Sequence, residues 1–255
     1  MHKAHETDNT AALANLLERI GKGEDPSLLR KEATKLLSSL CPNDIALAEK
    51  NLIEHGWPAQ LVHQLSSAFM LMGIVEEHGA SLKTTLKHTH ILRLVIAEHD
   101  MLRCFIADLE QTARNIYESG NLTDTCTDFR KLCHITEHLE AMQEHIEREE
   151  DIIFPYLCRH GWASLCRAAQ NDHRYITIAI GDMIGLITSF DKNKTRQFKV
   201  KLNSIVKYLC PILREHIFQE DNILYPIAIK VIDDKTVWDK MKILCDEIGY
   251  CGIHM

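Results

Sequence analysis

Hydrophobic residues in the first third of the chain recur every three or four positions, as they do on one face of an α-helix. They follow this spacing in four short stretches, which are separated by glycine, proline and polar residues. The residues before Thr10 are polar and are expected to fray. The pattern predicts four short helices, over about 10–20, from Pro26 to Leu37, between Pro42 and Gly56, and over about 59–77.

Longer amphipathic stretches follow the segment 78–81 (His-Gly-Ala-Ser), which is expected to link two domains. The loops between them are short, and no stretch alternates hydrophobic and polar residues for long enough to support a sheet. We therefore predict an all-α fold, with a small helical domain over 1–80 and an up-down-up-down four-helix bundle with one extra helix over 81–255. The predicted helices of the second domain run over about 82–119, 124–159, 164–190, 195–232 and 236–248.

One stretch of the second long helix returns 71 positions later, in the fourth. Residues 145–155 read HIEREEDIIFP and residues 216–226 read HIFQEDNILYP, with five identical positions. In each copy a His and a Glu stand four residues apart, so their side chains lie roughly 40° apart around a helix and about 6 Å apart along it. Such a pair can reach one metal ion.

The repeat extends to the helix before each copy, where a His stands beside an acidic residue. These pairs are Glu98-His99 and Asp172-His173, placed 46 and 43 residues before the His of the copy that follows. Each half of the bundle is thus expected to be a helical hairpin with one His on its first helix and a His/Glu pair on its second. Two such hairpins face to face bring together six expected metal ligands: His99, His145, Glu149, His173, His216 and Glu220.

Four imidazoles and two carboxylates suit a pair of iron ions. Carboxylates can bridge two cations and offset their charge, while neutral imidazoles bind Fe(II) and leave it oxidisable. Ferritin-like di-iron bundles use more carboxylate, about four Glu to two His. The histidine-rich set therefore favours reversible binding over strong oxidation of a substrate. We expect two non-haem irons joined by an oxo or hydroxo bridge.

Composition excludes several other classes of function. Of the 255 residues 45% are hydrophobic, and a formal net charge of −7 without a long basic run argues against nucleic-acid binding. No apolar run approaches the roughly 20 residues of a membrane span, and the polar start is no secretory signal, so a cytoplasmic protein without membrane contact is expected. The nine cysteines contain no Cys-x-x-Cys pair, which argues against a zinc ribbon or an iron–sulfur cluster. Nucleotide-binding glycine motifs and a nucleophile elbow are also absent from the sequence.

The two copies and the acid-His pairs before them resemble the hemerythrin-like His/His/Glu cation-binding domain. The resemblance covers about residues 84–232, and segment 238–251 is similar to the end of the form of this family that carries an extra helical domain. It implies a hemerythrin-like four-helix bundle. It also implies a non-haem di-iron centre that meets oxygen, nitric oxide or peroxide.

The chain departs at two positions from the oxygen-carrying hemerythrins. Those proteins have a fifth His four residues after the His of the third helix, where this chain has Thr177. A fifth His ligand from elsewhere, His138 or His90, stays an open alternative, as does solvent. Oxygen-carrying hemerythrins also use an Asp five residues after the last His. Here that residue is Asp221, whereas the internal repeat favours Glu220.

The first copy also contains residues that are not expected to bind metal. Glu147, Arg148 and Glu150 are expected on a solvated face. Pro155 and its counterpart Pro226 lack a backbone N–H and are expected to kink or end their helices. The aromatic residue before each proline is expected in the core.

Residues 10–72 resemble an uncharacterised all-helical domain that is often fused ahead of hemerythrin-like domains in bacteria and archaea. The likeness lies in segments 24–26 (EDP), 45–49 (IALAE) and 52–58 (LIEHGWP). It ends near 64–69 (QLSSAF), where that family tends to carry a Cys and a His. No metal or redox role of those two residues can be carried over to this chain.

We therefore expect a di-iron protein that binds O2 or NO as a sensor, carrier or scavenger, with the N-terminal domain contacting a protein partner. The alternative is a di-iron oxidoreductase that reduces NO or peroxide, or a repair protein that donates iron to damaged iron–sulfur clusters. Turnover needs an electron donor and an access channel, and the sequence displays neither. Whether the chain is an enzyme therefore stays open. In a third interpretation, a helical interaction protein holds a metal that is only structural.

Overall fold

The computed structural model describes residues 2–24, 26–37, 39–40, 42–58, 61–62, 64–66, 69 and 82–250. Regular structure within these residues is helical, and they contain no strand, which confirms the all-α prediction. The chain forms two compact units. One combines residues up to Thr85 with 153–170 and 218–237, and the other combines 86–152 and 171–217 with the chain from Trp238 onward. The domain boundary near residue 80 stays a prediction.

The N-terminal region contains α1 (His2–Gly21), α2 (Pro26–Leu37) and α3 (Pro42–Glu54). The described residues at 61–62, 64–66 and 69 are also helical. Helix α1 packs against both α2 and α3. Their contacts bury a face rich in leucine and alanine, as the spacing predicts. Its members are Leu13, Leu16, Leu17, Leu29, Ala33, Ile45, Ala48 and Leu52.

Helix α1 begins earlier than the sequence pattern predicts. It starts at His2, so the expectation that the residues before Thr10 fray is wrong. This polar segment contains Lys, Ala and Glu, which favour a helix, and no glycine or proline to end it. The predicted fourth helix over 59–77 lies largely outside the described residues, and the predicted linker 78–81 lies wholly outside them.

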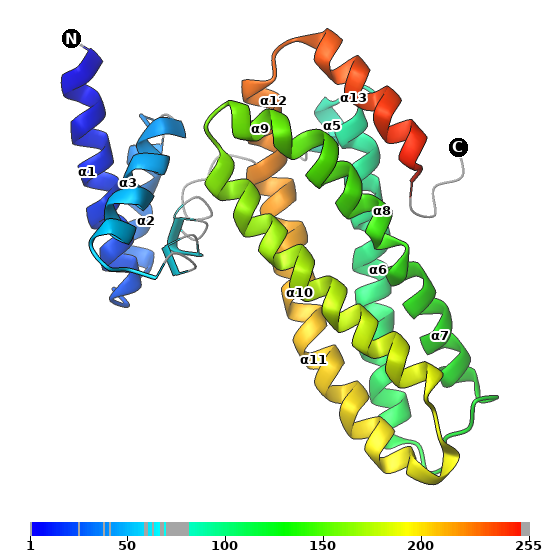
Figure 1. The fold of residues 1–255 in the computed structure, drawn as a ribbon. Helices are drawn as coiled ribbons and strands as arrows, with labels where there is room; N and C mark the ends of the chain where they lie inside the picture. Colours follow the sequence, from blue (N-terminus) through cyan, green and yellow to red (C-terminus); the bar gives the residue numbers. More distant parts are fainter. Residues whose placement is uncertain are drawn as a thin grey trace. The chain divides into compact units, whose positions relative to one another are not determined.

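The second predicted domain is a bundle of four antiparallel helical segments, labelled α6, α7 with α8, α10 and α11 in Figure 1. A short helix, α5 (Leu82–Thr85), precedes the bundle, and the 3-10 turn η2 (Lys192–Lys194) lies between α10 and α11. The single helix predicted over 82–119 is therefore two helices, because α6, the first helix of the bundle, begins only after His90. The principal bounds are α6 (Ile91–Glu118), α7 (Thr127–Glu140), α8 (Met142–Glu147), α10 (Ala163–Thr188), α11 (Thr195–Gln219) and α13 (Lys235–Ile248).

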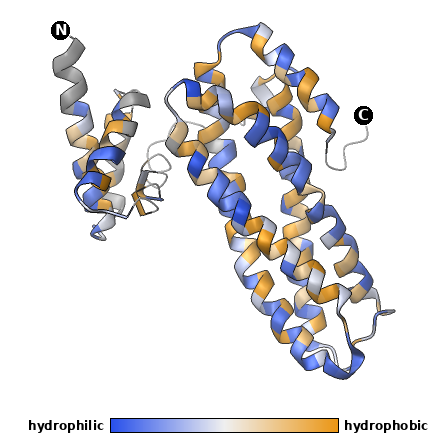
Figure 2. Ribbon diagram, viewed as in Figure 1, coloured by the Kyte–Doolittle hydropathy of each residue, from blue (hydrophilic) through white to orange (hydrophobic). Residues whose placement is uncertain are grey.

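Hydrophobic and hydrophilic residues alternate along every bundle helix, and the hydrophobic ones form the core (Figure 2). Leu109 and Leu132 are fully buried in this core. Phe129, Phe190 and Phe198 pack against one another with ring centroids 4.6–5.8 Å apart. A core of this kind contributes most of the stability of a helical bundle. Charged residues that are buried within this apolar core are exceptions to its composition.

A π-helical turn interrupts both of the helices that carry the repeated motif. The turn η1 (Arg148–Ile153) joins α8 to α9 (Phe154–Arg159), and the turn η3 (Glu220–Leu224) joins α11 to α12 (Tyr225–Val231). Each turn precedes a proline in the first turn of the next helix. Proline has no N–H and its ring clashes with the carbonyl four residues earlier, so a wider turn before it relieves the clash. The helical path continues through each proline.

Candidate metal centre

The six predicted ligands come from four bundle segments and point into the bundle interior. Helices α6 and α10 supply His99 and His173, while the two motif helices supply the His/Glu pairs. All six side chains are between 0% and 2% exposed. Burying so many polar groups in an apolar core costs stability unless they bind one another or a ligand. Their shared burial therefore marks this place as a site.

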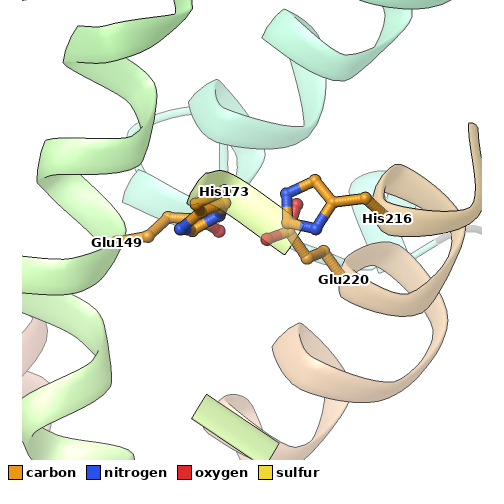
Figure 3. Close-up of side chains that lie close together, drawn as sticks. All are labelled: Glu149, His173, His216 and Glu220. Carbon is orange, nitrogen blue, oxygen red and sulfur yellow. The ribbon is translucent and has the colours of Figure 1, made fainter. Parts of the chain in front are cut away.

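The six residues form two adjoining groups of potential ligand atoms. Glu149, His173, His216 and Glu220 make up the first group (Figure 3), and His99, His145 and again Glu220 make up the second. Within each group the ligand atoms lie within 4.8 Å of one another. Glu220 belongs to both groups, so its carboxylate lies where the two positions adjoin. The face-to-face arrangement expected from the repeat is thus present.

The second carboxylate also reaches both hairpins. The Oε2 atom of Glu149 lies 3.1 Å from Nε2 of His173 and 3.6 Å from Nε2 of His145. The Nε2 atoms of His99 and His145 lie 3.1 Å apart. Nitrogen and oxygen lone pairs thus converge on a small buried volume, which is the arrangement that a cation satisfies.

Three further acidic residues lie behind the histidines, at the ring nitrogen that faces away from the group. Nδ1 of His145 is 2.8 Å from Oε2 of Glu98, and Nδ1 of His173 is 2.7 Å from Oε1 of Glu150. Nδ1 of His216 lies 3.8 Å from a carboxylate oxygen of Asp172. A carboxylate that accepts the Nδ1–H fixes the ring and leaves Nε2 to bind a metal.

These contacts show which histidine the acidic residue of each acid-His pair faces. Its position beside a His in the sequence does not show this. In the first half Glu98 contacts His145 on the following motif helix, rather than only supporting its neighbour His99. In the second half Asp172 has the equivalent position beside His216, but the 3.8 Å between its carboxylate oxygen and Nδ1 of His216 is longer than a hydrogen bond. The internal repeat therefore places a carboxylate near the motif His in both halves, and in the first half this carboxylate is hydrogen-bonded to it.

Glu98 is an ionised carboxylate in a buried position. Burial alone would raise its pKa, but the hydrogen bond from His145 and the positive charge of Arg148 outweigh it, and the net effect is a pKa below the usual value. Arg148 also donates from Nη2 to Oε2 of Glu98. The carboxylate is 1% exposed and the guanidinium 0% exposed. A buried pair of this kind is costly to break from one side only.

The expectation that Arg148 and Glu150 lie on a solvated face is wrong. Arg148 is fully buried, and Glu150 is half-buried against His173, while Glu147 is exposed as expected. Arg148 is three residues after His145 and reaches Glu98 in the interior, while the π-helical turn that begins at Arg148 changes the regular 3.6-residue spacing for Glu150. Pro155, which follows the turn, is the one feature of the sequence that indicates it.

The residues considered for a fifth His ligand lie outside both groups. His138 is half-buried, stacks on Phe105 with centroids 4.5 Å apart, and lines a small pocket beside His145. His90 caps α6, because its Nδ1 accepts a hydrogen bond from the N–H of Leu92 at 3.2 Å. Thr177 is exposed. Among the described residues, the potential ligand groups contain four histidines.

Comparison with family models identifies both parts of the chain. Residues 90–228 match the hemerythrin HHE cation binding domain, and the chain belongs to that family. Residues 13–69 match a family of unknown function, DUF438. Both resemblances drawn from the sequence are thereby confirmed. No curated protein matches the chain. In the part of the chain that the structure describes, no helix is both long and apolar enough to cross a bilayer.

Proposed function

We propose that the bundle holds two iron ions and binds O2 or NO, so that the protein acts as a sensor, carrier or scavenger of these gases. The observation that carries the proposal is the position of Glu220, which belongs to both groups of potential ligand atoms. Glu149 similarly reaches a His of each hairpin. Two cation positions that share carboxylates are typical of a binuclear centre.

The residues themselves would perform three tasks. His99, His145, His173 and His216 would each bind through Nε2, with the ring held by the carboxylate behind it where one is present. The two shared carboxylates would offset the positive charge. Iron bound there would supply reversible electron transfer and an open coordination position for a diatomic gas. Burial of the ligands would exclude larger substrates.

Two features of the surroundings support a small ligand. Thr177 is exposed and lies in neither group of potential ligand atoms, so it does not replace the fifth His of oxygen-carrying hemerythrins, and solvent or a gas would complete the ligand set. The pocket beside His145 is lined mainly by apolar side chains, among them Met101, Leu102 and Phe105. Apolar linings suit O2 and NO better than charged substrates.

The proposal also gives a role to the N-terminal domain and a location to the protein. The N-terminal domain over 1–80 would contact a protein partner and pass the ligand state of the bundle to it. The described cysteines are all free thiols, which supports a reducing, cytoplasmic location.

The test is an anaerobic titration of the ferrous protein with NO and, separately, with O2, followed by absorbance spectroscopy. The proposal predicts a saturable adduct that is reversed when the gas is removed. Continued consumption of NO or peroxide in the presence of a reductant would instead establish the oxidoreductase. Transfer of iron to a cluster-depleted acceptor protein would establish the repair function. A bound metal with no response to either gas would leave only a structural role.

A further inference from the structure

Arg148 connects the metal centre with the end of the described chain. Its side chain is fully buried, although it is the first residue of the π-helical turn and was expected at the surface. It donates from Nη2 to Glu98 and from Nη1 to the backbone carbonyl of Gly249. Its guanidinium also lies over the ring of Tyr250, 4.8 Å from the ring centroid. One cation is therefore held by groups 50 and about 100 residues away from it in sequence.

The same carboxylate oxygen of Glu98 that Arg148 contacts also accepts a hydrogen bond from His145. His145 Nδ1 lies 2.8 Å from that Oε2 atom. A continuous series of contacts thus runs from Tyr250 and Gly249 through Arg148 and Glu98 to an expected metal ligand. All of these residues belong to one compact unit.

The C-terminal segment is itself built to present these groups. The N–H of Gly249 donates to the carbonyl of Cys245 at 3.0 Å, and its φ of +105° lies in the left-handed region that favours glycine, so it closes α13. The hydroxyl of Tyr250 donates to Asp246 at 2.8 Å. Helix α13 in turn buries Trp238, Met241 and Cys245. The positions of the Gly249 carbonyl and the Tyr250 ring are therefore fixed by the helix.

The second half of the internal repeat lacks this arrangement. The position equivalent to Arg148 is Gln219, which carries no charge. Asp172, the counterpart of Glu98, is 32% exposed and lies 3.8 Å from His216, whereas Glu98 is 1% exposed and lies 2.8 Å from His145. Metal binding by the repeat does not by itself require a buried arginine. The contact with the C-terminal segment is an addition to one half only.

We infer that segment 248–250 is a positioning element for the metal centre, acting through Arg148 and Glu98 on His145. This inference rests on the proposed function, because it concerns a ligand of the proposed metal pair. Loosening the segment frees Arg148, which lets Glu98 and then the His145 ring move away from the binding orientation. Because linkage is reciprocal, loss of the metal also loosens the segment. A partner that binds the C-terminal segment would thereby change metal affinity.

The test compares Tyr250→Ala with Tyr250→Phe in the full chain. Both variants lose the hydrogen bond to Asp246, but only Tyr250→Ala loses the ring that lies over Arg148, and neither touches an expected ligand. The first measurement is backbone hydrogen exchange of the metal-free proteins around residues 145–149. The second is the dissociation constant for Co(II), a spectroscopic probe that needs no oxygen chemistry.

The inference predicts faster exchange at 145–149 in Tyr250→Ala than in Tyr250→Phe, together with weaker Co(II) binding, by up to about thirtyfold if the whole cation–π contact is coupled to the metal. Glu98→Gln should weaken Co(II) binding by about 10- to 100-fold, as other losses of a carboxylate behind a ligand His do. Exchange that rises only at 248–250, or unchanged Co(II) affinity, overturns the inference. If the wild-type chain binds neither iron nor Co(II), the proposed function fails, and the exchange comparison alone decides whether the segment positions His145.

Discussion

The Nε2 atoms of His99 and His145 lie 3.1 Å apart in the buried interior of the bundle, although the two residues are 46 positions apart in sequence. The other ring nitrogen of His145, Nδ1, is hydrogen-bonded to Glu98, so Nε2 is the atom that faces His99. Two imidazole nitrogens at this distance can share one proton or bind one cation. Protons therefore compete with metal here, and metal affinity should fall as the pH is lowered.

Replacing His145 tests whether this pair binds metal. His145→Ala should lose about one equivalent of metal per chain, because the second group has only His99 and Glu220 left. The matched control is His138→Ala. His138 lies on the preceding helix and stacks on Phe105, about 10.5 Å before His145 along the helical path. Metal analysis after anaerobic reconstitution should give the wild-type value for the control, and an equal loss in both variants would make His138 a ligand.

The carboxylate behind His173 gives a second prediction. Glu150→Gln keeps the size of the side chain but weakens its hold on Nδ1 of His173, so metal affinity should fall by about 10- to 100-fold. Glu147→Gln removes the same charge from an exposed position three residues earlier. Competition with a chelator would measure both affinities. Equal effects of the two substitutions would mean that only net charge matters.

The choice between Glu220 and Asp221 can be decided by two neutral substitutions. Glu220 is 1% exposed and belongs to both groups of potential ligands, whereas Asp221 is half-buried and takes the repeat position of Glu150, behind the ligands. Glu220→Gln should therefore lower metal stoichiometry, and Asp221→Asn should change only the affinity. Elemental analysis and chelator competition separate the two effects. The reverse pattern would assign the ligand to Asp221.

His90 predicts a pH-dependent contribution to stability. Burial lowers its pKa, and its neutral Nδ1 accepts the hydrogen bond that caps α6. As the pH falls below the ordinary His value, the unfolded chain takes up a proton more readily than the folded one, so the free energy of unfolding decreases. His90→Asn retains a capping side chain that does not titrate. In the metal-free protein, the variant should gain about 1 kcal/mol over the wild type between about pH 7 and pH 5.

Urea unfolding of the two proteins across this pH range measures that difference. Other histidines are common to both chains, so their titration cancels in the comparison. A difference that stays constant with pH would mean that His90 does not titrate with folding.

The sequence was sufficient for the bundle and for the six clustered residues because both depend on regular spacing. Hydrophobic periodicity identified each long helix, and the recurrence of His-x-x-x-Glu identified the motif helices. The repeat also gave each hairpin its lone His. Packing two similar hairpins face to face then leaves little choice for where His99 and His173 lie.

Arg148 and Glu150 could not be placed in this way. Glu150 lies within a π-helical turn, which shifts its residues relative to a regular helix, and Arg148 is held in the interior by Glu98 and the carbonyl of Gly249. The proline that favours the turn is visible in the sequence, but whether it kinks, ends or widens a helix depends on the packing around it. The contact of Arg148 with Gly249 joins residues 101 positions apart and has no periodic signal.

The proposed binuclear iron centre is tested by the metal content and optical spectrum of the full chain, purified without oxygen, reconstituted with Fe(II) and then exposed to O2. A binuclear iron centre that binds O2 reversibly should give about two irons per chain and a charge-transfer band that appears with oxygen and disappears when the gas is removed. In His145→Ala and in His216→Ala the band should be lost, and the iron content should fall by about one equivalent per chain. A chain that holds no more than one metal ion, or that retains zinc in preference to iron, would contradict the binuclear iron centre.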